Sequence, residues 1–190
     1  DLIIAVDPDA DRCALAVPDP GAEAGWSPLS GDQIGCLLGE FLAARGLEGS
    51  LANSIVSSRL LARIAEAHGL VHHTTLTGFK WIARAPKLAF GYEEAIGFCP
   101  NPQIARDKDG IASSVVAASL FAALKVEGRT AWDELDRLAH VHGLHVTGPL
   151  TFRVEEIEQI ATGMARLRAQ PPSVLAGSPV VEVSDLSEGY

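Results

Sequence analysis

Three aspartates, Asp7, Asp9 and Asp11, alternate along the chain directly after an apolar run, and Arg12 follows them. Carboxylates at this spacing repel one another unless a cation neutralises them, and hard oxygen ligands suit Mg²⁺ or Ca²⁺. A solvated acidic turn is the ordinary alternative, but the apolar runs 2–6 and 13–17 on both sides favour a positioned loop. We therefore expect a divalent metal site, with Arg12 as a bidentate donor to a substrate phosphate.

Other metal and phosphate chemistries can be weighed against the same loop. A calcium EF-hand requires glycine at the sixth position and glutamate at the twelfth, where this chain has Arg12 and Pro18, so it is excluded. A dehalogenase-type phosphatase would use the first aspartate as nucleophile and the second as acid. It typically has Thr or Val where Asp11 stands, and it remains an alternative. A non-catalytic Mg²⁺-binding module is a further one.

Composition narrows the class of partner. The 190 residues carry a formal net charge of −9, so the chain lacks the excess of basic residues that nucleic-acid binding requires.

The longest apolar stretch, 111–124, is interrupted by serines and is too short for a membrane span, so we expect a buried helix there. Isolated cysteines at 13, 36 and 99 favour a reducing, cytoplasmic setting. Because the chain opens on a core-like strand and its only methionine is Met164, we expect either a processed protein or a piece of a longer one.

Short apolar runs alternate with segments of helical period, which is typical of an α/β fold. The sequence predicts strands at 2–6, 13–17, 54–57, 71–75, 88–90, 150–154 and 180–183. It predicts helices at 30–44, 59–68, 109–125, 130–139 and 155–169, with a loop over 18–28. The last strands and helix indicate a small α+β piece.

Four motifs in order give this pattern a family likeness. They are Asp7-Pro-Asp-Ala-Asp-Arg12, the run from Thr75 to Trp81, Gly91-Tyr-Glu-Glu-Ala-Ile-Gly97, and Asp107-Lys-Asp-Gly-Ile111. Together they resemble the α-D-phosphohexomutase superfamily, which includes phosphoglucomutases and phosphomannomutases. The resemblance implies mixed-sheet, three-layer α/β/α units followed by a truncated α+β piece. It implies the C-terminal half of a metal-binding domain at 1–48, a sugar-binding domain at 49–143 and the start of a last domain at 144–190.

The resemblance also implies roles for individual residues. Asp7, Asp9 and Asp11 would hold Mg²⁺, and catalytic roles would fall to Arg12 beside the transferring phosphoryl group and to Lys108 at the reacting hydroxyl. The substrate-binding residues would be Thr77, Gly78, Lys80, Glu93 and Glu94. Much of the family has serine where this chain has Ala95, which bears on the choice between glucose and mannose.

The implied activity is interconversion of hexose 1-phosphate and hexose 6-phosphate, through a phosphoserine and a bisphosphorylated sugar. The partners would be hexose phosphates and the missing domains of the same polypeptide, without nucleic acid or membrane. No Thr-Ala-Ser-His-Asn-like segment with a phosphorylatable serine occurs in the 190 residues. We therefore expect the chain alone to be inactive as a mutase.

Overall fold

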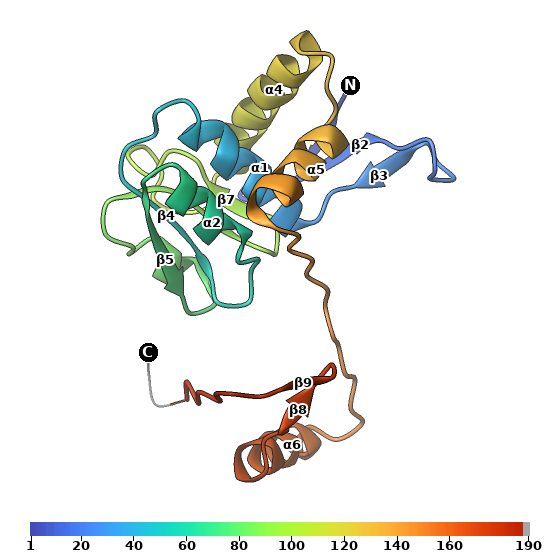
Figure 1. Cartoon of the computed structure of the whole chain (residues 1–190), viewed down its shortest axis with the longest axis vertical. Coiled ribbons are helices and arrows are strands. Elements are labelled where there is room, and N and C mark those ends of the chain that lie inside the picture. Colours follow the sequence, from blue (N-terminus) through green and yellow to red (C-terminus); the bar gives the residue numbers. More distant parts are fainter. Residues whose placement is uncertain (188–190) are drawn as a thin grey trace. The chain divides into compact units, whose positions relative to one another are not determined.

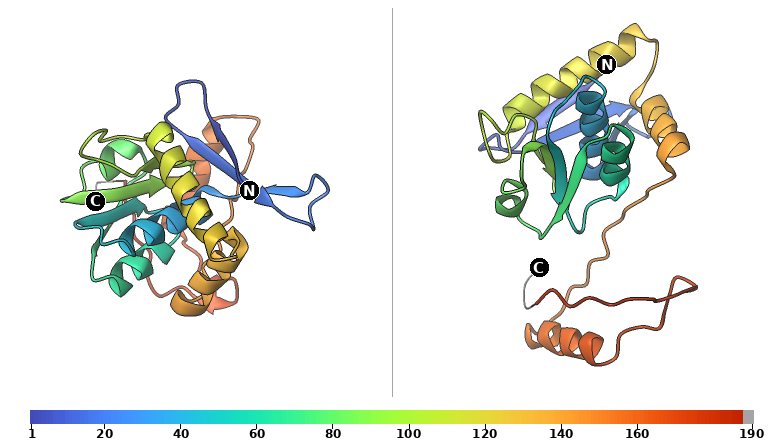
Figure 2. Two further views of the ribbon diagram at one scale, coloured as in Figure 1. Left: turned by 90° about the horizontal axis from the view of Figure 1, so that it is seen from above. Right: turned by 60° about the vertical axis from the view of Figure 1, so that its left-hand side comes forward.

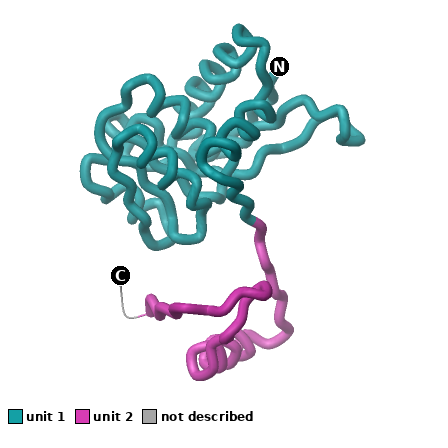
Figure 3. Tube along the Cα trace, in the orientation of Figure 1, with its two compact units in different colours: residues 1–147 teal, residues 148–190 magenta. Residues whose placement is uncertain are grey.

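The computed structural model of the chain describes residues 1–187. It contains two compact units, Asp1–Thr147 and the segment from Gly148 onward (Figure 3). All the residues with predicted catalytic, metal-binding or sugar-binding roles lie in the first unit.

A small antiparallel sheet opens the first unit. Its strands are β1 (Ile3–Val6), β2 (Cys13–Pro18) and β3 (Trp26–Pro28), in that order (Figure 1). The strands predicted at 2–6 and 13–17 are confirmed, whereas β3 lies in the segment expected to be a loop. Cys13, Leu15 and Val17 of β2 are buried, but Ile3 and Val6 of β1 are each 46% exposed. The expectation of a buried first strand is therefore wrong, because β1 lies at the edge of its sheet.

A four-stranded mixed sheet forms the centre of the unit. Its order is β5 (Val71–Thr75), β4 (Ser50–Ser54), β6 (Leu88–Glu93) and β7 (Gly97–Cys99). β4 runs parallel to β5 and β6, and β7 runs antiparallel to β6. The strand predicted at 54–57 is misplaced, because the chain turns after Ser54 and the amide of Ser57 donates to the carbonyl of Ser54 at 3.0 Å.

Helices cover both faces of this sheet, as the predicted three-layer arrangement requires. α1 (Gly31–Ala43) and α2 (Leu60–Ala67) pack in a core with Leu51 and Phe90, whereas the short α3 (Phe79–Ile82) packs in a second core with Ala52 and Leu88 (Figure 2, left). Neighbouring strand residues point to opposite faces, so Leu51 and Ala52 serve different cores. The predicted mixed α/β class is confirmed.

Two further helices, α4 (Gly110–Val126) and α5 (Ala131–His142), complete the unit. Asp109 caps α4 by accepting from the amide of Ala112 at 2.8 Å, as helix-start residues do. α4 buries only one face, and Ile111 and Val115 on the other are exposed, so the expectation of a buried helix holds for one face alone. Within residues 1–187 no single helix meets the length and hydropathy expected of a membrane span. The helices α4 and α5 reach that length and hydropathy only when they are taken together, and the pair is bent by 89° at the break between them.

The second unit consists of α6 (Glu158–Ala169) and a two-stranded hairpin of β8 (Val174–Leu175) and β9 (Ser178–Pro179). The helix predicted at 155–169 is confirmed with a later start. The strands predicted at 150–154 and 180–183 are wrong, because neither segment has a hydrogen-bonded strand partner among the described residues. Apolar alternation alone does not make a strand without a neighbour to pair with.

Candidate functional site

The acidic loop, residues 7–12, connects β1 to β2 and gathers its carboxylates. One oxygen from each of Asp7, Asp9 and Asp11 lies within 4.8 Å of the other two. The loop is held in this shape by a turn, in which the amide of Ala10 donates to the carbonyl of Asp7 at 3.0 Å and Ala10 adopts a φ of 58°. The amide of Arg12 donates to Asp7 Oδ1 at 3.1 Å. The sequence motif therefore folds into a single cluster of oxygen ligands.

The electrostatics of the loop suit a hard divalent cation. The hydrogen bond from the Arg12 amide lowers the pKa of Asp7, so this carboxyl stays ionised. Within residues 1–187, Asp11 Oδ1 is the buried side-chain oxygen that lacks a hydrogen-bond partner. Arg12 Nε lies 3.9 Å from this oxygen, beyond hydrogen-bond distance. An orphaned carboxylate oxygen among hard donors fits Mg²⁺, which takes oxygen ligands.

Lys108 approaches the acidic loop from the segment before α4. Its ammonium lies 3.2 Å from Asp11 Oδ2 and 3.8 Å from Asp107 Oδ1. Burial alone would lower the pKa of Lys108, but the hydrogen bond and charge of Asp11 outweigh it, and the pKa is raised. The lysine is therefore a fixed cation at the rim of the loop.

Gly110 allows this approach. Its amide donates to the carbonyl of Ala10 at 3.1 Å, and a Cβ at this position would lie 2.5 Å from the carbonyl oxygen of Arg12. Any larger residue would push the start of α4 away from the acidic loop. The Asp-Gly pair in the fourth motif thus caps a helix and lets it touch the acidic loop.

The loop of residues 91–97 contacts the acidic loop, and we call it the sugar loop after the role that the family resemblance implies for it. Gly97 forms an isolated β-bridge with Arg12, and a Cβ on Gly97 would lie 2.3 Å from Lys108 Cδ and 3.0 Å from Glu93 Oε1. Glu93 and Lys108 therefore lie against the same glycine. Burial raises the pKa of Glu93, and the charge of Lys108 partly offsets that effect.

Glu94 points elsewhere. Its Oε2 accepts hydrogen bonds from the hydroxyls of Ser54 and Ser57, each at 2.9 Å. These serines lie at the end of β4 and in the turn that follows, so Glu94 ties the sugar loop to the neighbouring strand. Sequence reasoning missed both serines because it treated 54–57 as a strand. The three serines at 54, 57 and 58, close together in the sequence, were the available signal.

Thr77 and Gly78 lie directly before α3, and Lys80 lies within it. Gly78 takes a φ of 100° immediately before α3, a conformation that favours glycine. The ammonium of Lys80 lies 5.4 Å from the centre of the Trp81 ring. Among the described residues, no hydrogen bond or ion pair joins this segment to the acidic loop. The link is Phe79, whose ring centre lies 5.5 Å from the ammonium of Lys108.

The structure thus brings Asp7, Asp9, Asp11, Arg12, Glu93 and Lys108 into one connected cluster. The side chain of Arg12 is 49% exposed, which leaves its guanidinium accessible to a ligand. Three carboxylates able to hold a cation, two basic groups able to meet a phosphate and one half-buried carboxyl able to meet hydroxyls suit a phosphorylated, hydroxyl-rich ligand.

Comparison with known proteins agrees with this chemistry. Residues 30–140 match the family model of phosphoglucomutase/phosphomannomutase, α/β/α domain III. The chain is 43% identical over 187 residues to a protein of Haemophilus influenzae named "Probable phosphomannomutase", covering 97% of this chain and 38% of that protein. It is 30% identical over 212 residues to human phosphopentomutase, covering 100% of this chain and 34% of the relative. The chain therefore spans little more than a third of the length of these relatives.

Solved structures share the fold. A Thermus thermophilus protein described as a "putative phosphomannomutase" superimposes with a TM-score of 0.64 at 24% identity, covering 75% of this chain and 31% of that one. The parafusin phosphoglucomutase of Paramecium superimposes with a TM-score of 0.58 at 22% identity, covering 74% of this chain and 24% of that one.

Proposed function

The chain belongs to the phosphoglucomutase/phosphomannomutase family, and from this premise we propose that it carries the metal and sugar sites of a Mg²⁺-dependent mutase of hexose phosphates. The observation that carries the proposal is the contact between the acidic loop and the sugar loop. Lys108 reaches Asp11 and lies against the same glycine as Glu93. A metal-bound phosphoryl group and a sugar ring would meet at that point.

Asp7, Asp9 and Asp11 would hold the ion. Bound Mg²⁺ supplies charge neutralisation of a transferring phosphoryl group. Arg12 would donate to the equatorial phosphoryl oxygens, because a guanidinium offers paired donors and its side chain here is 49% exposed. These residues bind and orient the phosphoryl group before transfer.

Lys108 and Glu93 would act on the sugar. The ammonium of Lys108 would donate a hydrogen bond to the oxygen of the reacting hydroxyl and offset the negative charge that develops there, and Glu93 would accept hydrogen bonds from ring hydroxyls. Glu94 supports this arrangement by fixing the loop to Ser54 and Ser57. Thr77, Gly78 and Lys80 would contact the far end of a ligand that spans from the acidic loop past Phe79. Ala95 leaves no hydroxyl where much of the family has serine, so the sugar loop lacks one hydrogen-bonding group for the sugar at this position.

The complete reaction would pass a phosphoryl group from a phosphoserine to the sugar and return the other phosphate from the bisphosphorylated intermediate. No serine in a Thr-Ala-Ser-His-Asn-like context occurs in the 190 residues. We therefore propose that this chain binds Mg²⁺ and sugar phosphate without mutase turnover.

The test measures binding and turnover of the chain in parallel. Mg²⁺ and glucose 1,6-bisphosphate are titrated by calorimetry, and glucose 1-phosphate is assayed for conversion to glucose 6-phosphate and for release of inorganic phosphate. We expect Mg²⁺ binding that Asp9→Asn weakens at least tenfold, while the loop variant Asp19→Asn leaves it unchanged. Sugar bisphosphate should bind, and neither product should form.

Three outcomes would contradict the proposal. Phosphate release that Asp7→Asn abolishes would favour the dehalogenase-type phosphatase. Mg²⁺ binding without any sugar phosphate binding would favour a non-catalytic metal-binding module. Conversion of glucose 1-phosphate to glucose 6-phosphate by the chain alone, with contaminating enzyme excluded, would overturn the predicted inactivity.

A further inference from the structure

A buried carboxylate outside the metal cluster collects hydrogen bonds from three separate segments. Asp32, in the first turn of α1, is 7% exposed. Its Oδ1 accepts from the amide of Ser58 at 2.7 Å and from the hydroxyl of Tyr92 at 2.8 Å. Its Oδ2 accepts from the hydroxyl of Thr147 at 2.6 Å. Both oxygens are therefore used, as a buried carboxylate requires.

Two of these bonds lead to the sugar loop. Tyr92 directly precedes Glu93, and Ser58 directly follows Ser57, whose hydroxyl donates to Glu94. The connections close a ring, which runs from Asp32 through the Tyr92 side chain, along the backbone to Glu94, and through Ser57 and Ser58 back to Asp32. The conformation of the sugar loop is thus fixed partly by a carboxylate that does not line it.

Helix α1 packs so closely against this closed set of contacts that two of its glycines have no room for a side chain. A Cβ on Gly31 would lie 2.0 Å from the carbonyl oxygen of Glu94, and a Cβ on Gly35 would lie 2.4 Å from the Tyr92 ring. Burial raises the pKa of Tyr92 well above its usual value, so the phenol remains a donor. Helix, strand and loop are in direct contact around Asp32.

The third bond leads to the end of the first unit. Thr147 is its last residue, is itself exposed, and belongs to the segment 143–147, which has no regular secondary structure. That segment, together with residues of α1 and α5, lines a cavity of about 420 Å³. The hydrogen bond from the Thr147 hydroxyl to Asp32 therefore anchors a segment that has no regular secondary structure.

We propose that Asp32 is a positioning residue that couples the segment 143–147, through Thr147, to the sugar loop. Loosening either end loosens the other, because bonds from both ends hold the same carboxylate in place and coupling between two sites is reciprocal. The inference rests on the proposed function only in treating residues 91–97 as the sugar-binding loop.

Amide hydrogen exchange of the full 190-residue chain, followed residue by residue by NMR, tests this coupling. Thr147→Val removes the hydroxyl at nearly constant volume and, being at an exposed site, should leave the fold intact. We expect exchange at residues 92–97 and at Ser58 to accelerate about tenfold, because a hydrogen bond to a charged group is lost. Thr147→Ser should restore slow exchange, and Thr151→Val in the second unit should change nothing.

The reciprocal variant is Tyr92→Phe, which removes only the phenolic oxygen. We expect faster exchange at residues 146–148, far along the chain from the substitution. Combining it with Thr147→Val should give less than the sum of the two effects, as for residues in one hydrogen-bond network.

Two results would overturn the inference. Acceleration confined to 146–148 in Thr147→Val would mean that the anchor is local, and equal acceleration throughout the first unit would mean a general structural role. These measurements use neither metal nor sugar. Coupled exchange in a chain whose spectrum does not respond to glucose 1,6-bisphosphate and Mg²⁺ would therefore keep the inference and count against the proposed function.

Discussion

The ammonium of Lys108 lies 3.2 Å from Asp11 Oδ2, so the proposed catalytic lysine and a proposed metal ligand form an ion pair. The pair is partly shielded, since the two side chains are 17% and 31% exposed. A cation that binds the acidic loop must share Asp11 with this lysine or displace it. The lysine thus neutralises part of the charge that the three aspartates create.

Replacing Lys108 should therefore strengthen metal binding. Lys108→Met removes the competing charge while keeping most of the side-chain volume, and we expect a Mg²⁺ affinity three to ten times higher, corresponding to about 1 kcal/mol. Calorimetric titration measures it. Lys80→Met, which removes a lysine that lies against Trp81, is the matched control and should leave the affinity unchanged. An affinity that falls in Lys108→Met would contradict the competition.

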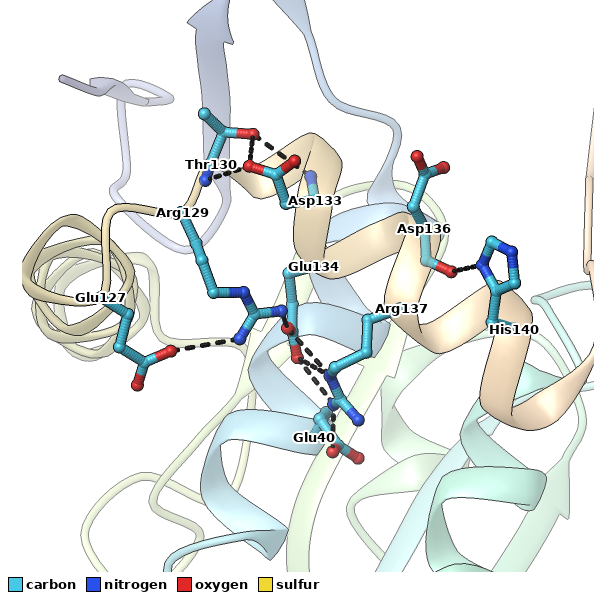
Figure 4. A network of polar contacts seen from close by, with 9 residues as sticks. All are labelled: Glu40, Glu127, Arg129, Thr130, Asp133, Glu134, Asp136, Arg137 and His140. Carbon is cyan, nitrogen blue, oxygen red and sulfur yellow. Dashed lines mark hydrogen bonds and ion pairs between the residues drawn. The ribbon is translucent and has the colours of Figure 1, made fainter.

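Arg137 joins two buried carboxylates in the network drawn in Figure 4. It donates to Glu134 and to Glu40, which are 6% and 7% exposed, and Arg129 also pairs with Glu134. Arg137→Met would leave buried charge partly unpaired. Because the Arg137 side chain is itself 38% exposed, we expect a loss of about 2 kcal/mol in the free energy of unfolding.

Urea denaturation followed by tryptophan fluorescence measures this loss, because Trp26, Trp81 and Trp132 all lie in the first unit. The control is Arg63→Met, which breaks an exposed pair with Glu66 and should cost less than about 0.5 kcal/mol. Equal effects of the two substitutions would show that burial of the carboxylates does not matter.

Gly31 should not tolerate a side chain. An added Cβ would lie 2.0 Å from the carbonyl oxygen of Glu94 and 2.6 Å from its carbonyl carbon, so one of the two backbone segments would have to shift. We expect Gly31→Ala to destabilise the first unit by about 2–3 kcal/mol in the same fluorescence assay and to shift the NMR signals of the sugar loop. Gly163→Ala in α6 meets nothing within 4 Å and should leave the fluorescence transition unchanged. A harmless Gly31→Ala would contradict the close contact of α1 with the loop.

His72 should make stability fall in mild acid. Burial, assisted by the neighbouring His73, lowers the pKa of His72 to about 4 from a usual value of 6.5. Between these values the unfolded chain binds a proton that the folded chain does not, so the free energy of unfolding decreases as the pH falls, by at most about 1.4 kcal/mol per pH unit. The neutral ring keeps its hydrogen bond with Asn53 at 3.0 Å.

The measurement is the free energy of unfolding between pH 7 and pH 4. Carboxyl groups also titrate there, so the test is the difference between the chain and His72→Gln, whose dependence on pH should be shallower. His140→Gln on the exposed side of α5 should retain the slope of the unsubstituted chain. Identical slopes in all three proteins would contradict the burial of His72.

The sequence by itself determined the local structure and the clustering of the proposed metal ligands. Helix starts at Ser30, Asp109 and Thr130 are encoded within one turn, because each side chain caps an amide three residues later. The alternation of apolar runs determined the α/β class, and Asp7, Asp9 and Asp11 cluster because they share one short loop. These features depend on neighbours in the chain, so they can be predicted from spacing.

Only the tertiary structure decided which groups meet. Strand β4 begins at Ser50 and ends at Ser54 because its hydrogen-bonding partners β5 and β6 set its register. Ser54 at its end and Ser57 in the following turn thereby hold Glu94. The pairing of Lys108 with Asp11 and the three bonds to Asp32 join segments that are distant in sequence. Such contacts arise from the packing of helices and loops on the sheet, and no local pattern in the chain encodes them.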